Sequence, residues 1–75
     1  MNVVLSRHAK RRGKLYGISK ATINNILKNR DLSQGKHEIV ETVEGFTYPI
    51  KIVIEVRGET VTVITNYPLK KGGKR

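Results

Sequence analysis

Cysteine is absent from this chain of 75 residues, and its absence excludes three kinds of chemistry. Without a thiol the chain has no disulfide framework, no thiolate zinc site and no cysteine nucleophile. Other metal ligands are scarce, because the sequence has only two histidines and one aspartate. We therefore expect neither a metal ion nor another cofactor.

Long apolar runs are missing as well. No stretch of about 20 apolar residues is available to cross a bilayer, and residues 1–5 are too short and wrongly flanked for a signal peptide. We therefore expect a cytoplasmic protein with no membrane partner. The length and the lack of an internal repeat predict one small domain over residues 1–69. Residues 70–75 have the composition of a disordered basic tail.

Acidic residues are few and confined to one part of the sequence. The chain has 15 Lys and Arg against 6 Asp and Glu, which gives a net charge of +9. No acid occurs in residues 1–30, which hold eight of the cations, and all six acids fall within residues 31–69. A domain so polarised attracts polyanions before any specific contact forms, and nucleic acid is the commonest polyanion in the cytoplasm. The charge distribution therefore predicts a nucleic acid, and RNA in the first place, as a partner. The alternative is a charge excess that keeps the protein soluble and has no partner.

The beginning of the sequence predicts a short strand followed by a helix. Residues 2–5 are typical of a strand, and Ser6 is suited to cap a helix over about residues 7–15. Gly17 is suited to end this helix in a left-handed turn. Gly13 weakens the helix by about 1 kcal/mol relative to alanine, so packing must stabilise it.

A second helix is predicted over about residues 20–29, with Ser19 as its N-cap. Ile18, just before the cap, is placed to pack on the first turns as a hydrophobic staple. Apolar residues recur on one side of this helix and predict a buried stripe. The stripe consists of Ile23, Ile26 and Leu27.

After residue 36 the apolar period changes to two, which predicts antiparallel strands. Two-residue turns are expected at residues 44–45 and 58–59, and such turns fix the register of the strands they connect. The predicted pairs are Val43–Phe46, Glu41–Tyr48 and Ile39–Ile50 around the first turn, and Val56–Val61, Ile54–Val63 and Ile52–Thr65 around the second.

Both registers collect apolar side chains on one face, although Tyr67 and the single acid Glu41 fall there too. This common face predicts a three-stranded antiparallel meander with the helices packed on it. The expected fold is an α+β domain in the order strand, helix, helix and three strands. The opposite face is predicted to carry Lys51, Val53, Glu55, Arg57, Thr62, Ile64 and Asn66.

The first predicted helix concentrates five cations and a histidine within about two helical turns. At 100° per residue, Lys10, Arg11 and Lys14 share one side and are expected to face solvent. There they suit contacts to phosphates that do not depend on sequence. His8 and Arg12 fall inside the arc that we expect to face the sheet.

An inward-turned Arg12 requires a partner, because a buried guanidinium without one is costly. Since Glu41 is the only acid on the predicted apolar face, the structural interpretation is an ion pair between Arg12 and Glu41. The alternative joins Arg12 to His8, which stands one turn away on the same helix face. His suits proton transfer near neutral pH, and Arg suits bidentate binding of phosphate oxygens. RNA can be cleaved by such groups without a metal.

Other residues could complete either kind of site. Tyr67, at the expected boundary of helix and sheet, is a third candidate catalytic residue, although tyrosines there are also typical of the edge of a core. Lys51 and Arg57 suit either contact with an RNA strand or simple solvation. The candidate nucleic-acid-binding residues are Lys10, Arg11, Lys14, Lys51, Arg57, Lys70 and Lys71.

Three short motifs stand out in the sequence: His8-Ala9-x-x-Arg12, Gly17-Ile18-Ser19 and Val63-Ile64-Thr65-x-Tyr67-Pro68. Together they resemble domain-of-unknown-function family 4258, a family of small bacterial domains with the pattern His-Ala-x-x-Arg-x-x-x-Arg-Gly-Ile-Ser. Tyr16 stands where that family usually has its second Arg. The resemblance implies a relation to the Barnase–EndoU–colicin–RelE group of folds, which includes many metal-independent ribonucleases that act as toxins. It also implies a site at His8 and Arg12.

Three functional hypotheses are therefore open. The first is a toxin-like endoribonuclease that uses His8 as acid or base and Arg12 to bind phosphate. The second is a nucleic-acid-binding module without catalysis, which needs only the exposed cations. The third is a protein-interaction domain whose basic surface meets an acidic partner such as an antitoxin.

Overall fold

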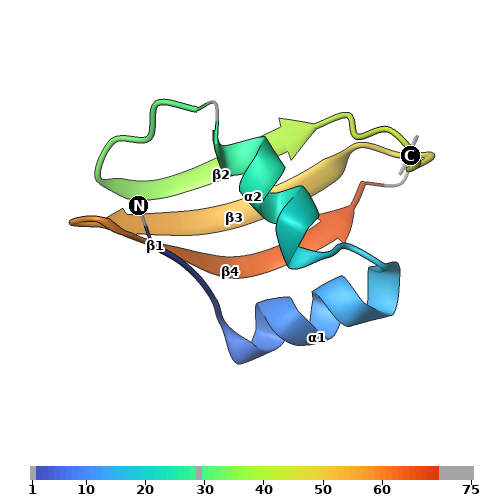
Figure 1. Ribbon diagram of the computed structural model, residues 1–75, viewed down its shortest axis with the longest axis horizontal. Coiled ribbons are helices and arrows are strands. Elements are labelled where there is room, and N and C mark those ends of the chain that lie inside the picture. Colours follow the sequence, from blue (N-terminus) through green and yellow to red (C-terminus); the bar gives the residue numbers. More distant parts are fainter. Residues whose placement is uncertain (1, 29, 70–75) are drawn as a thin grey trace.

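The structure, a computed structural model, describes residues 2–28 and 30–69. These residues form one mixed four-stranded sheet and two helices (Figure 1). The predicted α+β class and the predicted order of elements are confirmed. In chain order the elements are β1 (Asn2–Leu5), α1 (Arg7–Tyr16), α2 (Lys20–Lys28), β2 (Gly35–Glu41), β3 (Ile50–Arg57) and β4 (Thr60–Pro68).

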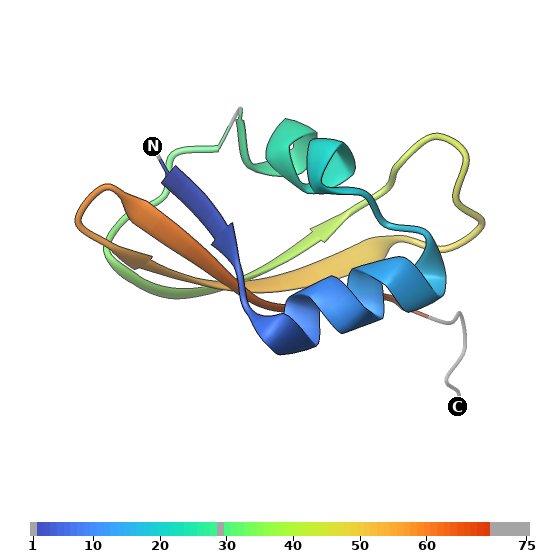
Figure 2. The same ribbon diagram turned by 60° about the horizontal axis from the view of Figure 1, so that its bottom comes forward.

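The strands lie in the order β1-β4-β3-β2. The pairs β2–β3 and β3–β4 are antiparallel, as the predicted meander requires, whereas β1 pairs with β4 in parallel. Helix α2 lies over one face of the sheet, in front of β3 and β4 in Figure 1. Helix α1 packs along β4 beyond the end of β1 (Figure 2). The two helices thus occupy different places: α2 covers the core, and α1 lies next to β4 at the end of β1.

Polar caps fix where the helices begin. Ser6 Oγ accepts a hydrogen bond from Ala9 N at 3.0 Å, and Ser19 Oγ accepts one from Thr22 N at 3.1 Å. Both predicted N-caps are therefore confirmed. Helix α1 ends at Gly17, whose φ of 72° lies in the left-handed region, as predicted.

The core lies between α2 and the sheet. Ile23, Ile26 and Leu27 of α2 are buried, which confirms the predicted stripe. They belong to one cluster with the inward residues of β3 and β4, and full burial of each such side chain contributes about 1.5–3 kcal/mol. The buried residues of those two strands are Ile50, Ile52, Ile54, Val56, Val61, Val63 and Asn66.

The connection between β2 and β3 differs from the predicted hairpin. The turn at residues 44–45 forms, but the strands stop short of it. Glu41 pairs with Ile50 rather than with Tyr48, so the predicted register is wrong by two residues. Pro49 directly precedes β3, and a residue without an N–H cannot extend the ladder toward the turn. Because the shift is even, the apolar residues keep their predicted face.

A β-bulge interrupts the pairing of β3 with β4. The predicted register of this second hairpin holds from the turn to Val63. Beyond it the ladder shifts, and Ile52 pairs with Asn66 instead of Thr65. The extra residue in β4 turns each following side chain to the other face of the sheet.

The bulge exchanges the predicted surroundings of two residues. Asn66 is predicted on the polar face, but it lies on the core side and is completely buried. Tyr67 is predicted on the apolar face, but it pairs with Lys51 on the opposite face of the sheet, which we call the open face. Both predictions are wrong for the same reason, because the predicted register does not include the extra residue of the bulge in β4.

Some predictions fall on residues that the structure does not describe. The predicted basic tail at residues 70–75, with Lys70 and Lys71, lies outside the described residues, as does residue 29 at the predicted end of the second helix. Neither α1 nor α2 is long and apolar enough to cross a membrane, and these are the helices of the described ranges.

Candidate nucleic-acid interface

Helix α1 is held against β4 by the hydroxyl of Ser6 and by the buried side-chain amide of Asn66. Ser6 Oγ donates a hydrogen bond to the Ile64 carbonyl at 2.8 Å, just before the helix begins. One turn later, Asn66 Nδ2 donates to the Ala9 carbonyl at 3.1 Å. Both Asn66 and Ala9 are fully buried. These two bonds fix the position and the rotation of α1 on the sheet.

Gly13 allows α1 to approach the chain that follows it. A Cβ atom at this position would lie 2.8 Å from the Ile18 carbonyl oxygen and 3.5 Å from Asn66 Oδ1. The Gly13 carbonyl in turn accepts a hydrogen bond from Ile18 N at 2.8 Å. Small residues at positions 9 and 13 therefore form the inward side of α1, and larger residues lie beside them.

Four cations cover the outer side of α1, and all four are exposed. The predicted orientation of Lys10, Arg11 and Lys14 toward solvent is confirmed. Within residues 2–28 and 30–69, no cation of α1 forms an ion pair. The first turn of α1 contains no acid, and neither does that of α2. The four exposed cations are Arg7, Lys10, Arg11 and Lys14, and we call them the α1 cations.

His8 and Arg12 lie on another side of α1 from Lys10. At 100° per residue, each is about 160° from Lys10 around the helix axis, and they are about 40° from each other. His8 is exposed, so its predicted inward position is wrong, whereas Arg12 is half-buried. Arg12 Nη1 donates a hydrogen bond to Tyr16 Oη at 3.4 Å. The side chains of positions 8, 12 and 16 thus follow one another along a single stripe of the helix.

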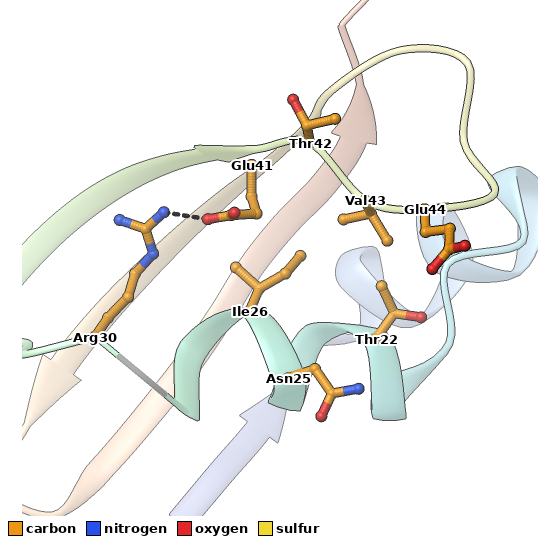
Figure 3. Close-up of a pocket in the computed structure, with 8 residues that line it drawn as sticks. All are labelled: Thr22, Asn25, Ile26, Arg30, Glu41, Thr42, Val43 and Glu44. Atoms are coloured by element: carbon orange, nitrogen blue, oxygen red, sulfur yellow. Dashed lines mark hydrogen bonds and ion pairs between the residues drawn. The ribbon is translucent and has the colours of Figure 1, made fainter.

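The predicted ion pair between Arg12 and Glu41 is wrong. Glu41 pairs with Arg30, at the edge of a pocket between α2 and the loop after β2 (Figure 3). No residue that lines this pocket comes from α1. Both side chains of the pair are partly exposed, and such a surface pair contributes about 0–1 kcal/mol. Arg12 therefore has no acidic partner among the described residues.

Lys51 and Arg57 already have acidic partners on the open face. Lys51 Nζ lies 3.0 Å from Glu38 Oε1, and Arg57 Nη2 lies 3.3 Å from Glu55 Oε2. The hydrogen bond and the charge of Glu38 raise the pKa of Lys51, with a smaller contribution from Tyr67. An anion at either cation would compete with a carboxylate, so these two cations are less available to an anionic ligand than the α1 cations.

Tyr67, the third candidate catalytic residue, does not lie on the predicted face of the sheet. It stands across from Lys51 on the open face, after the bulge in β4. Tyr16 is the tyrosine whose hydroxyl contacts Arg12. The structure thus brings Arg12 and Tyr16 together, and it leaves His8 free to reach solvent one turn away.

Two parts of the arrangement were missed by reasoning from the sequence. One is the buried position of Asn66, which results from the bulge in the last strand. The sequence signal for this bulge is Ile64, because it directly follows Val63 and interrupts the alternation of apolar and polar residues. The other is a row of polar residues on α2, Lys20, Asn24 and Lys28, which a helical wheel of the second helix would have revealed.

Comparison of the chain with models of protein families, with curated proteins and with solved structures gives no match. The resemblance to family 4258 therefore stays a prediction that depends on the short motifs around His8, Arg12 and Gly17.

Proposed function

We propose that the protein binds RNA through the α1 cations. The observation that carries the proposal is the absence of any acid from α1 and α2, combined with four exposed cations on α1 that have no ion-pair partner among the described residues. A polyanion is the partner that such a surface attracts most strongly. The proposal also assigns the protein to the cytoplasm, where RNA is abundant.

The stability of the fold does not account for the cations in the first turns of the two helices. A cation in the first turn of a helix opposes the macrodipole and costs about 0.3–1 kcal/mol at an exposed site. Arg7 and Lys10 begin α1, and Lys20 begins α2, with no acid in either first turn. A ligand that neutralises these cations would explain why they are present although they lower the stability of the fold.

Binding can be tested with variants that remove equal charge from two surfaces. In the variant Arg11→Gln with Lys14→Gln, we expect binding of a short labelled RNA at low salt to weaken at least about tenfold, with a shallower dependence on salt. The control is Arg30→Gln with Lys36→Gln, which changes the net charge equally in the connection after α2 and on β2. We expect this control to bind within about threefold of the unmodified protein.

Fluorescence anisotropy at several salt concentrations measures both effects. Equal weakening in the two double variants would mean that net charge, and not the α1 surface, governs binding. Failure of the unmodified protein to bind any RNA, together with tight binding to an acidic protein, would replace the proposal by the protein-interaction hypothesis.

We propose as a second candidate function that the same protein cleaves RNA. The stripe of His8, Arg12 and Tyr16 supports it, because an exposed imidazole stands one turn from a guanidinium whose position is held by a tyrosine hydroxyl. His8 would take the proton of a 2′-hydroxyl, whose oxygen forms a bond to phosphorus. The bond from phosphorus to the 5′ oxygen breaks, and this oxygen takes a proton from water. Arg12 would bind the phosphate oxygens as negative charge develops there.

Cleavage should be measured in EDTA, with the 2′,3′-cyclic phosphate end as the diagnostic product. We expect His8→Ala to lower the rate at least about 100-fold, the scale of lost general acid-base catalysis. His37→Ala is the matched control, because His37 lies on β2 with its Nε2 2.6 Å from the Ser33 carbonyl oxygen. Cleavage that survives His8→Ala, or that falls equally in both variants, would contradict this second function while leaving RNA binding intact.

A further inference from the structure

Two shallow grooves lie along β1, and together they form a single basic channel. One is lined by residues of β1 and by Lys20, Asn24 and Lys28 of α2. The other is lined by β1, Lys10 of α1 and again Lys20. Val3 and Lys20 line both grooves, so the two grooves adjoin each other beside the strand. We call this channel the lysine groove, and no acid lines it.

The three lysines approach the lysine groove from two helices. Lys20 and Lys28 are eight residues apart on α2, which places them about 12 Å apart along the helix axis. That span corresponds to about three to four stacked nucleotides of one strand, at 3.4 Å each. Asn24 lies between them and offers an amide that both donates and accepts hydrogen bonds.

No carboxylate neutralises these lysines within the described residues, although Lys28 lies in the last turn of α2, where the helix dipole favours a cation. All three are exposed, and none has an ion-pair partner within the described residues. Lys20 stands in the first turn of α2, where the helix dipole disfavours a cation. By contrast, Arg30, Lys51 and Arg57 are each paired with a glutamate.

The floor of the lysine groove is aliphatic. Val3 and Leu5 are half-buried, and Val4, which lines the second groove, is 50% exposed. Unpaired bases can lie on such a floor, whereas the bases of a duplex are stacked and turned inward. Cations on the walls with an apolar floor between them therefore fit a single strand better than a double helix.

We propose that the lysine groove binds the backbone of single-stranded RNA, with Lys10, Lys20 and Lys28 contacting phosphates. This inference rests on the proposed RNA binding and names the form of RNA that is bound. The α1 cations attract RNA, and the groove determines that the bound segment is unpaired.

The test compares a short labelled single-stranded RNA with a duplex of the same sequence. We expect the unmodified protein to bind the single strand more tightly. In Lys20→Gln with Lys28→Gln, affinity for the single strand should fall at least about tenfold, and the slope of log affinity against log salt should decrease by about 1.4, or about 0.7 for each lost phosphate contact. Lys20→Arg with Lys28→Arg should restore both. The Arg30→Gln and Lys36→Gln double variant is the matched control for net charge.

The outcomes separate this inference from the function on which it rests. If Arg11→Gln with Lys14→Gln weakens binding but Lys20→Gln with Lys28→Gln does not, the groove inference is overturned and RNA binding stands. Preference of the unmodified protein for the duplex also overturns it. If the unmodified protein binds neither RNA, the proposed function itself fails. Binding of anionic vesicles or poly-glutamate that matches RNA in affinity and in dependence on Lys20 and Lys28 would show a general anion site and overturn the assignment to RNA.

Discussion

The variant Asn66→Asp is expected to lower the free energy of unfolding by more than about 3 kcal/mol at pH 7. Asn66 is fully buried, and its Nδ2 donates to the Ala9 carbonyl of α1. A carboxylate there would place a second acceptor against that carbonyl, in a fully buried site. Its other oxygen would take the place of Asn66 Oδ1, which has no hydrogen-bond partner. Chemical denaturation monitored by circular dichroism measures the loss.

The loss in Asn66→Asp should depend on pH with a definite sign. Burial without a counter-charge raises the pKa of the new carboxyl in the folded state above its unfolded value of about 3.9. The folded state then binds the proton more tightly, so stability is recovered as pH falls through the folded pKa. The protonated group can also donate to the Ala9 carbonyl, as the native amide does.

Two further variants make the Asn66 result interpretable. Asn25→Asp introduces the same chemical change at an exposed position of α2 and should stay within about 0.5 kcal/mol of the unmodified protein. Asn66→Ala should be destabilised without the recovery at low pH, because it has no group to protonate. An Asn66→Asp variant as stable at pH 7 as the Asn25 control would refute the buried contact between β4 and α1.

The variant Gly13→Ala is expected to lower the free energy of unfolding by about 2 kcal/mol, although alanine favours helices. Helix propensity alone predicts a gain of about 1 kcal/mol at this position. The added Cβ, however, would lie 2.8 Å from the Ile18 carbonyl oxygen, which belongs to the backbone and cannot rotate away. Moving that segment strains the hydrogen bond from Ile18 N to the Gly13 carbonyl.

Thermal and chemical unfolding measure whether Gly13→Ala raises or lowers stability. A gain means that helix propensity dominates, and a loss means that the close approach to the Ile18 carbonyl dominates. Lys14→Ala is the matched control, because it places alanine on the exposed side of the same helix and should change stability by less than about 0.5 kcal/mol. A Gly13→Ala variant that is more stable than the unmodified protein would show that α1 does not approach the following chain as closely as described.

Local patterns in the sequence predicted the elements well because each depends on near neighbours. The caps at Ser6 and Ser19, the left-handed Gly17 and the buried stripe of α2 all follow from residues within one or two turns. The meander was predicted for a similar reason, since alternation and turn residues lie close together along the chain. These elements needed no knowledge of what packs against them.

The errors arise where distant segments meet. The inward side of α1 is centred on Ala9 and Gly13, two small residues, because the helix lies close against β4. The predicted inner arc is wider than this side and includes His8, which is exposed.

The pairing of Arg12 and the position of Tyr67 failed for related reasons. The partner of Glu41 is Arg30, which the register alone could not identify because it lies in the connection after α2. Tyr67 changed face because one extra residue was accommodated in β4. Of the candidate site, the exposed cations of α1 could thus be predicted, whereas the geometry around His8 and Arg12 required the tertiary structure.

The parallel pairing of the first strand with the last has a consequence for how the molecule assembles. Ser6 contacts Ile64 across 58 residues of sequence, and Ala9 contacts Asn66 across 57. Contacts of such long range form late, because the entropy of closing the intervening loop must be overcome first. During synthesis, α1 emerges early but finds its place only after β4 has followed it. The helix that carries five of the 15 Lys and Arg residues is thus positioned by nearly the last residues of the sheet. A chain that ends before β4 would have these cations but not the sheet that orients them.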